Sequence, residues 1–168
     1  VAVPLTDHVP ADAIVDRGAR VRFDADGNGA REWTWITPAA GWLVYDAGDR
    51  GSITSALQLF GDVTFRLFWS SGYEPMRALD DNGDGELAGA ELRHLALWHD
   101  RDRDGVSDAG EVRPLAAHGI VALSCHYVAG DGVRVAALSP NGARLADGRT
   151  RPTYDVILNH AATTLTRR

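Results

Sequence analysis

Two twelve-residue stretches of the chain place oxygen-bearing side chains at the spacing that calcium loops use. The first runs from Asp80 to Glu91 (DDNGDGELAGAE) and the second from Asp100 to Glu111 (DRDRDGVSDAGE). Each has an oxygen side chain at positions one, three and five, glycine at position six and glutamate at position twelve. Ca²⁺ is a hard cation that takes six to eight oxygen ligands, and the glycine permits the sharp turn. The pattern is that of complete EF-hand loops and predicts two calcium sites.

Each predicted site combines three side chains from the first half of the loop, a backbone carbonyl at position seven and a closing glutamate that supplies two oxygens. The predicted ligands of the first site are Asp80, Asn82, Asp84, Glu86 and Glu91, and those of the second are Asp100, Asp102, Asp104, Val106 and Glu111. The alternative is a pair of acidic surface turns, because Asp, Asn and Gly are also common turn residues. Two complete matches in succession favour the metal.

A shorter match, Asp24 to Glu32 (DADGNGARE), predicts a third calcium site of a different kind. The spacing of positions one to six is kept, but position twelve is Trp35, so the closing glutamate is missing. The flanking residues are typical of strands, and a tight hairpin turn is the alternative. The ligands of this strand–loop–strand site would be Asp24, Asp26, Asn28, Ala30 and Glu32.

The two complete loops begin twenty residues apart, so the helix that leaves the first loop would enter the second. Apolar residues recur at three- and four-residue steps from Leu92 to Trp98, which predicts one short helix shared by both loops, from about Gly89 to Trp98. Trp98 is expected to pack beneath the second loop. Further short helices are expected before the first loop, at 72–79, and after the second, at 112–117.

The rest of the chain carries aromatic and β-branched residues between Gly, Pro and Asn turns, which indicates strands. We therefore predict an α+β fold, in which a small antiparallel β-sheet packs on a compact EF-hand pair. Residues 1–20 are expected to form an irregular arm, 21–160 a single calcium-binding domain, and 161–168 a frayed tail. Within the domain, the expected β parts are 21–54 and 120–158, and the EF-hand pair occupies 72–117.

The net charge of −6 is concentrated in the three loops. Ten of the 23 acidic side chains are candidate carboxylate ligands, and the other 13 stand against 17 basic residues. Two bound Ca²⁺ ions would therefore bring the net charge to −2, and three would bring it to zero. An acidic chain without a basic stripe argues against nucleic acid as a partner. No apolar run is long enough to span a membrane.

The sequence contains no familiar catalytic motif, and we expect no enzyme. A nucleophile elbow and a phosphate loop are both absent, and the six histidines are scattered. Cys125 and His126 are neighbours in an expected strand, so their side chains would point to opposite faces. Trp33 and Trp35 would share one face of a strand, where they either fill the core or form an aromatic platform for a sugar.

The longest specific stretch, GYEPMRALDDNGDGELAGAELRHLALWHDRDRDGVSDAGEV at 72–112, resembles an EF-hand module of secreted bacterial RTX (haemolysin-type) and cell-surface proteins. FDADGNG at 23–29, GWLVYD at 41–46 and LFGD at 59–62 extend the resemblance. It implies an extracellular or cell-surface module, with the periplasm as an alternative location, that belongs to a larger protein and folds when it meets calcium. Some related modules process themselves by calcium-driven cleavage of an Asp–Pro bond, but this chain contains no Asp-Pro dipeptide.

Taken together, these features predict a calcium-binding structural module whose folding and rigidity depend on two Ca²⁺ ions, with a third ion in the Asp24 loop as an open question. Two alternatives remain. One is the calcium-triggered self-processing module, and the other is a carbohydrate- or surface-binding module that uses the aromatic residues of the β part.

Overall fold

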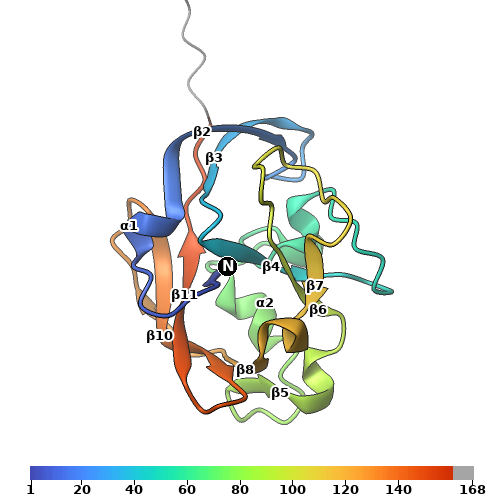
Figure 1. The fold of residues 1–168 in the computed structure, drawn as a ribbon, viewed down its shortest axis with the longest axis vertical. Helices are drawn as coiled ribbons and strands as arrows, with labels where there is room; N and C mark the ends of the chain where they lie inside the picture. The colour runs from blue at the N-terminus through green and yellow to red at the C-terminus, as the bar shows by residue number, and fades with distance from the viewer. Residues whose placement is uncertain (161–168) are drawn as a thin grey trace, which may run out of the picture.

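The computed structural model describes residues 1–160 and consists mostly of β-strands (Figure 1). The strands are β1 (Ala2–Pro4), β2 (Val15–Phe23), β3 (Arg31–Ile36), β4 (Ala40–Tyr45), β5 (Glu86–Ala88), β6 (Leu95–Trp98), β7 (Val112–Pro114), β8 (Ile120–Ser124), β9 (Val128–Ala129), β10 (Val135–Leu145) and β11 (Thr150–Val156). The α-helices are α1 (Ala11–Ile14) and α2 (Tyr73–Arg77). The 3₁₀ helices are η1 (Ala56–Gln58), η2 (Thr64–Arg66), η3 (Gly89–Leu92) and η4 (Leu115–His118).

One antiparallel sheet forms the centre of the molecule. Its strand order is β5-β8-β10-β11-β1-β4-β6-β7, and β9 pairs with β10 beside this path. The hairpin of β2 and β3 forms a separate two-stranded sheet. In Figure 1 this hairpin lies at one end of the molecule and the pair of β5 and β8 lies at the other end.

Strands in the middle of the sheet are buried on both faces, and their side chains alternate between two hydrophobic clusters. Trp42 and Trp98 belong to the cluster beneath the β2–β3 hairpin, whereas Leu43, Leu95 and Leu97 belong to the cluster on the opposite face. A strand that is covered on both faces is continuously apolar in sequence. This explains why the stretch from Leu95 to Trp98 carries no polar residue.

The predicted α+β fold with an EF-hand pair is wrong, because the structure is mostly β and no α-helix leaves the first loop or flanks the second, which lies between β6 and β7. The expected shared helix is only the single 3₁₀ turn η3, after which His94 adopts a left-handed φ of 65° and β6 begins. β6 pairs with β4 and β7, so its burial between two cores overrides the helix-like spacing of its apolar residues. The expected exit helix at 112–117 is β7 followed by η4, and only the helix before the first loop is present, as α2.

The N-terminal residues differ from the expected irregular arm. Ala2 pairs with Tyr154 of β11 on one side and with Trp42 of β4 on the other, which places β1 inside the main sheet. β2 already begins at Val15. The expected frayed tail, 161–168, lies outside the described residues. Among the helices within 1–160, none has the length and apolar character that crossing a bilayer requires.

Candidate metal centre

The two complete loops share one frame of hydrogen bonds. In each loop the aspartate at position one accepts the N–H of position six, and the aspartate at position five accepts the N–H of position seven. The glutamate at position twelve turns back across the loop and accepts the N–H groups of positions two and nine. In the first loop the acceptor–donor pairs are Asp80–Gly85 (2.8 Å), Asp84–Glu86 (2.9 Å), Glu91–Asp81 (3.0 Å) and Glu91–Ala88 (2.9 Å). In the second they are Asp100–Gly105 (3.1 Å), Asp104–Val106 (2.7 Å), Glu111–Arg101 (2.9 Å) and Glu111–Asp108 (3.3 Å).

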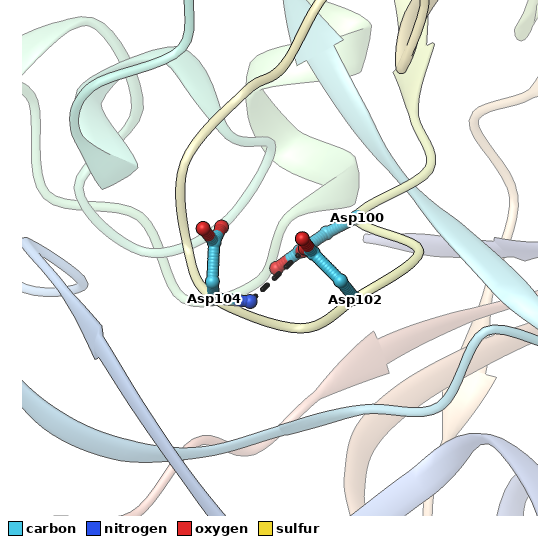
Figure 2. A group of neighbouring side chains, drawn as sticks. All are labelled: Asp100, Asp102 and Asp104. Carbon is cyan, nitrogen blue, oxygen red and sulfur yellow. Dashed lines mark hydrogen bonds between the residues drawn. The ribbon is translucent and has the colours of Figure 1, made fainter.

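In the second loop the carboxylates of positions one, three and five converge. One oxygen from each of Asp100, Asp102 and Asp104 lies within 4.8 Å of the others, and Figure 2 shows the three side chains on the inner side of the loop. Asp100 is buried, whereas Asp102 and Asp104 are exposed. The three carboxylates therefore form one acidic cluster. Asp100 is its buried member, and Asp102 and Asp104 are open to solvent.

The buried end of the second loop is tied to the aromatic core. Trp35 of β3 donates its indole N–H to Asp100 Oδ2 at 2.7 Å, and Trp98 of β6 donates to Glu111 Oε2 at 3.4 Å. Both indoles are fully buried, and their ring centroids lie 5.8 Å apart. The loop thus joins the β2–β3 hairpin to the main sheet, and Trp98 packs beneath it as predicted.

Burial and hydrogen bonds act in opposite directions on the two buried carboxylates. Burial raises the pKa of Asp100 to about 6, although the N–H groups of Gly105 and Trp35 favour its ionised form. Burial also acts to raise the pKa of Glu111, but the N–H groups of Arg101 and Asp108 outweigh it, so the pKa of Glu111 lies below its usual value. A charged Asp100 is therefore costly in this position until a cation neutralises it.

The donor set fits calcium. It consists only of carboxylate, amide and carbonyl oxygens, which are the ligands that Ca²⁺ prefers. Within residues 1–160, no arginine or histidine forms an ion pair with the side chains at positions one, three and five of either loop. The side chain of Glu86, at position seven, instead pairs with Arg144 of β10, which leaves its backbone carbonyl as the predicted ligand.

The glycine at position six has a left-handed backbone in both loops, with φ of 84° at Gly85 and 76° at Gly105. Their surroundings differ. A Cβ at Gly105 would lie 2.7 Å from the carbonyl oxygen of Arg22 in β2, whereas a Cβ at Gly85 would meet only the side chain of His126, which is exposed and can move. Loop two is thus fixed against the hairpin, and loop one is not.

This difference predicts unequal effects of alanine at position six. Gly85→Ala should destabilise the protein by about 1–2 kcal/mol, the usual cost of a left-handed alanine. Gly105→Ala should cost about 2–4 kcal/mol because a backbone clash is added. Urea unfolding of the two variants at saturating calcium measures the difference, and equal losses would show that the second loop does not press against β2.

The third candidate site is assembled only in part. Asp24 accepts the N–H of Gly29 at 2.8 Å, as position one does in the complete loops, but its other oxygen accepts the hydroxyl of Ser55 at 2.8 Å. Asp26 is paired with Arg31 at 3.6 Å. Asn28, Ala30 and Glu32 are exposed. Among the described residues, no hydrogen bond of this loop involves the Glu32 carboxylate, so the structure brings the first half of the predicted donor set together and not the second.

Other side chains considered from the sequence are placed as packing residues. Cys125 is fully buried, and burial raises the pKa of its thiol to about 12. Trp33 and Trp35 are both buried, at 7% and 0% exposure, so their rings do not form an open platform. Trp33 stacks on His160 and donates its N–H to Phe23, which explains its burial.

The role of Trp35 was missed from the sequence. Trp35 stands 65 residues before Asp100, and no local pattern connects them. The only signal is that Trp35 occupies position twelve of the incomplete loop, where a ligand would be expected. Because β2 pairs with β3, the Trp35 indole points into the core, and there it donates its N–H to Asp100 of the second loop.

Comparison with known proteins corrects the resemblance to EF-hand modules of RTX proteins. The SPM domain model matches residues 12–159. The iron-regulated protein FrpA of Neisseria meningitidis serogroup C is 37% identical over 111 residues. That alignment covers 62% of this chain and 10% of FrpA, so the chain corresponds to a small part of its relative. Identification as an EF-hand module is wrong, because the structure is mostly β, with only α2 before the first loop and strands on both sides of the second. Since the SPM model matches most of its length, the chain belongs to the SPM domain family.

Proposed function

We propose that this chain is a calcium-binding structural module, and that its folding and rigidity depend on two Ca²⁺ ions held by the loops 80–91 and 100–111. The observation that carries the proposal is the common hydrogen-bonding frame of the two loops. It fixes the carboxylates of positions one and five by the N–H groups of positions six and seven, and it brings the glutamate of position twelve back across each loop. A pair of unrelated surface turns would not repeat all four contacts.

The first ion would be held by Asp80, Asn82, Asp84, Glu91 and the carbonyl of Glu86. The second would be held by Asp100, Asp102, Asp104, Glu111 and the carbonyl of Val106. The Asp24 loop is left out, because Ser55 and Arg31 already engage two of its carboxylates. A bound ion supplies the positive charge that balances the crowded carboxylates, and the proposed role involves no chemical reaction.

The proposed consequence of binding is mechanical. The first loop contains β5, which pairs with β8 at one end of the molecule, and the second loop lies against the β2–β3 hairpin at the other end (Figure 1). Two ions would therefore fix both ends of the domain. Because Ca²⁺ binds the native loops and hardly the unfolded chain, each ion stabilises the fold by RT ln(1 + [Ca²⁺]/Kd), which rises with the logarithm of free calcium above Kd. Extracellular calcium-binding modules typically have dissociation constants of about 10⁻⁴–10⁻³ M, which suit the millimolar calcium outside cells. We therefore propose that the chain is part of a larger protein that is secreted or lies at the cell surface.

Substitution of the closing glutamates tests the assignment. Glu91→Gln and Glu111→Gln each remove one of the two oxygens that close a site, and each should weaken one of the two calcium-binding events by at least about tenfold. Isothermal calorimetry on chelator-treated protein measures both events in one titration.

Glu86→Gln is the matched control. It removes the same charge from the same loop, but the Glu86 side chain pairs with Arg144 and only its carbonyl is a predicted ligand. Calcium affinity should therefore change little. If Glu86→Gln weakened binding as much as Glu91→Gln, the effect would be one of net charge and the ligand assignment would be wrong.

A further inference from the structure

Three of the four asparagines in the chain, Asn28, Asn82 and Asn141, are followed directly by glycine. An Asn-Gly pair is open to spontaneous deamidation, because glycine has no side chain to keep its backbone nitrogen away from the asparagine amide. The glycine nitrogen attacks Cγ of the asparagine, the bond from Cγ to the side-chain nitrogen breaks, and ammonia leaves with the backbone proton. Water then opens the cyclic imide to give aspartate or isoaspartate. The surroundings of each pair decide whether this reaction can take place.

The pair at 141–142 lies within β10, where neighbouring strands hold it. Gly142 is buried, and a Cβ on it would collide with the side chain of Thr153 in β11. Asn141 is exposed, but its amide oxygen accepts the hydroxyl of Thr150 at 2.9 Å. Ring closure requires the asparagine side chain and the following nitrogen to move together, and the paired strands leave no room for that movement. This pair should therefore react slowly under all conditions.

The pair at 82–83 lies in the first loop, at positions three and four, and both residues are exposed. The N–H of Gly83, the attacking group, donates to Asp80 Oδ1 at 2.8 Å. The amide oxygen of Asn82, on the group that is attacked, accepts the N–H of Asp84 at 2.8 Å. Hydrogen bonds in an exposed loop open readily, and here both must open before the ring can close. Since Asp80 and Asn82 are both proposed calcium ligands, a bound ion would hold the two reacting groups apart.

The pair at 28–29 offers a comparison within the same molecule. Both residues are exposed, and the N–H of Gly29 donates to Asp24 at 2.8 Å, much as Gly83 donates to Asp80. The Asp24 loop, however, has no proposed ion, because Ser55 engages its first carboxylate. Asn28 is therefore an Asn-Gly pair in a similar turn but outside the proposed calcium sites.

We propose that Asn82 is a site of spontaneous deamidation whose rate is set by calcium at the first loop. This inference rests on the proposed function of that loop. In the ion-free loop the two hydrogen bonds open and the ring closes, whereas in the occupied loop ring closure waits until the ion leaves. Calcium then slows the reaction by the factor 1 + [Ca²⁺]/Kd, which is about tenfold when free calcium is about ten times Kd.

The two products have opposite consequences for the first site. Aspartate at position three is the residue that the second loop carries there as Asp102, so this product keeps the site. Isoaspartate inserts a methylene into the backbone, which displaces the later positions of the loop from Asp80 and abolishes the site. A chain that stays without calcium thus loses its first site permanently, whereas a chain that meets calcium keeps it.

Incubation of the protein in chelator and in millimolar calcium, at physiological temperature and neutral pH, tests the proposal. Peptide mapping by mass spectrometry measures deamidation at each asparagine, and enzymatic methylation measures isoaspartate. Deamidation of Asn82 should be about tenfold slower when calcium is about ten times Kd. Asn28 should react at the same rate in both solutions, and Asn141 should react slowly in both.

Glu91→Gln and Glu111→Gln form a matched pair of variants for this experiment. Both make the same substitution, but Glu91 closes the first loop and Glu111 closes the second. The ratio of the rates in chelator and in calcium is compared within each variant, so that any effect on the ion-free loop cancels. Glu91→Gln should remove most of the protection of Asn82, and Glu111→Gln should leave it unchanged.

Calorimetry on the incubated samples connects the modification to calcium binding. Protein aged in chelator should lose the first binding event in proportion to its isoaspartate content and keep the second, whereas Asn82→Asp should keep both. Two bound ions without slower deamidation at Asn82 would overturn this inference and leave the proposed function intact. Absence of binding heat would overturn the proposed function and calcium control of Asn82 together, and an unmodified Asn82 after long incubation in chelator would overturn the inference alone.

Discussion

Removal of calcium is expected to lower the melting temperature of this protein by about 10 °C. Each site contributes about 1.4–2.7 kcal/mol when free calcium is about 10–100 times the dissociation constant. Two sites therefore contribute about 3–5 kcal/mol, and in a domain of this size each kcal/mol shifts the midpoint by about 2–4 °C. The free protein also keeps Asp100 buried without an ion-pair partner among the described residues, which adds to the loss.

Circular dichroism melts in chelator and in millimolar calcium measure this shift. The double variant Glu91→Gln/Glu111→Gln is the control, and its two melts should nearly coincide. Magnesium should shift the wild-type curve less than calcium, because Mg²⁺ demands a smaller octahedral shell and gives up its water reluctantly. Coincident wild-type curves in chelator and in calcium would contradict the proposed role.

The second large effect concerns the indole of Trp35. Trp35→Phe is expected to weaken calcium binding at the second loop about tenfold and to leave the first loop unchanged. The indole N–H holds Asp100 Oδ2 at 2.7 Å, and a hydrogen bond to a charged group contributes about 1.5–3 kcal/mol. Without it, the carboxylate of position one is less well oriented and less well compensated for its burial.

Trp33→Phe provides the control for this prediction. Trp33 lies two residues away on the same strand and also loses a buried N–H hydrogen bond, but its acceptor is the carbonyl of Phe23 and not a loop carboxylate. It should lower stability without changing calcium affinity at either loop. If the two variants weakened calcium binding equally, the effect would come from the packing of the hairpin and not from the Trp35–Asp100 hydrogen bond.

The donor residues of the loops could be predicted from the sequence because the pattern that specifies them lies within one short segment of the chain. Asp, Asn, Gly and Glu at fixed offsets within twelve residues specify the turn and its hydrogen bonds, whatever elements lie on either side. The backbone at positions four and six illustrates this, because both residues have a left-handed φ in each loop. This holds even in the second loop, where position four is Arg103 and not glycine.

The elements beside the loops could not be predicted in the same way. The residues from Leu92 to Trp98 have helical spacing, yet Leu95 to Trp98 also fit a strand that is buried on both faces, and a short apolar run does not distinguish the two. The choice is made by partners far along the chain, because β6 lies between β4 and β7. A 3₁₀ turn and a left-handed His94 then replace the expected helix.

Long-range pairing also explains why the N-terminal strand could not be predicted from the sequence. β1 has only three residues and ends in Pro4, so it carries little strand signal. Its pairing with β11 joins Ala2 to Tyr154, at opposite ends of the described chain.

The central claim is that the two complete loops bind calcium and thereby hold the fold together. Calorimetric titration of chelator-treated protein with Ca²⁺ tests it most directly, with the Glu91→Gln and Glu111→Gln variants measured alongside. We expect two ions per chain in the wild type and one high-affinity ion in each variant. Absence of binding heat at millimolar calcium, or a stoichiometry that neither variant changes, would contradict the assignment.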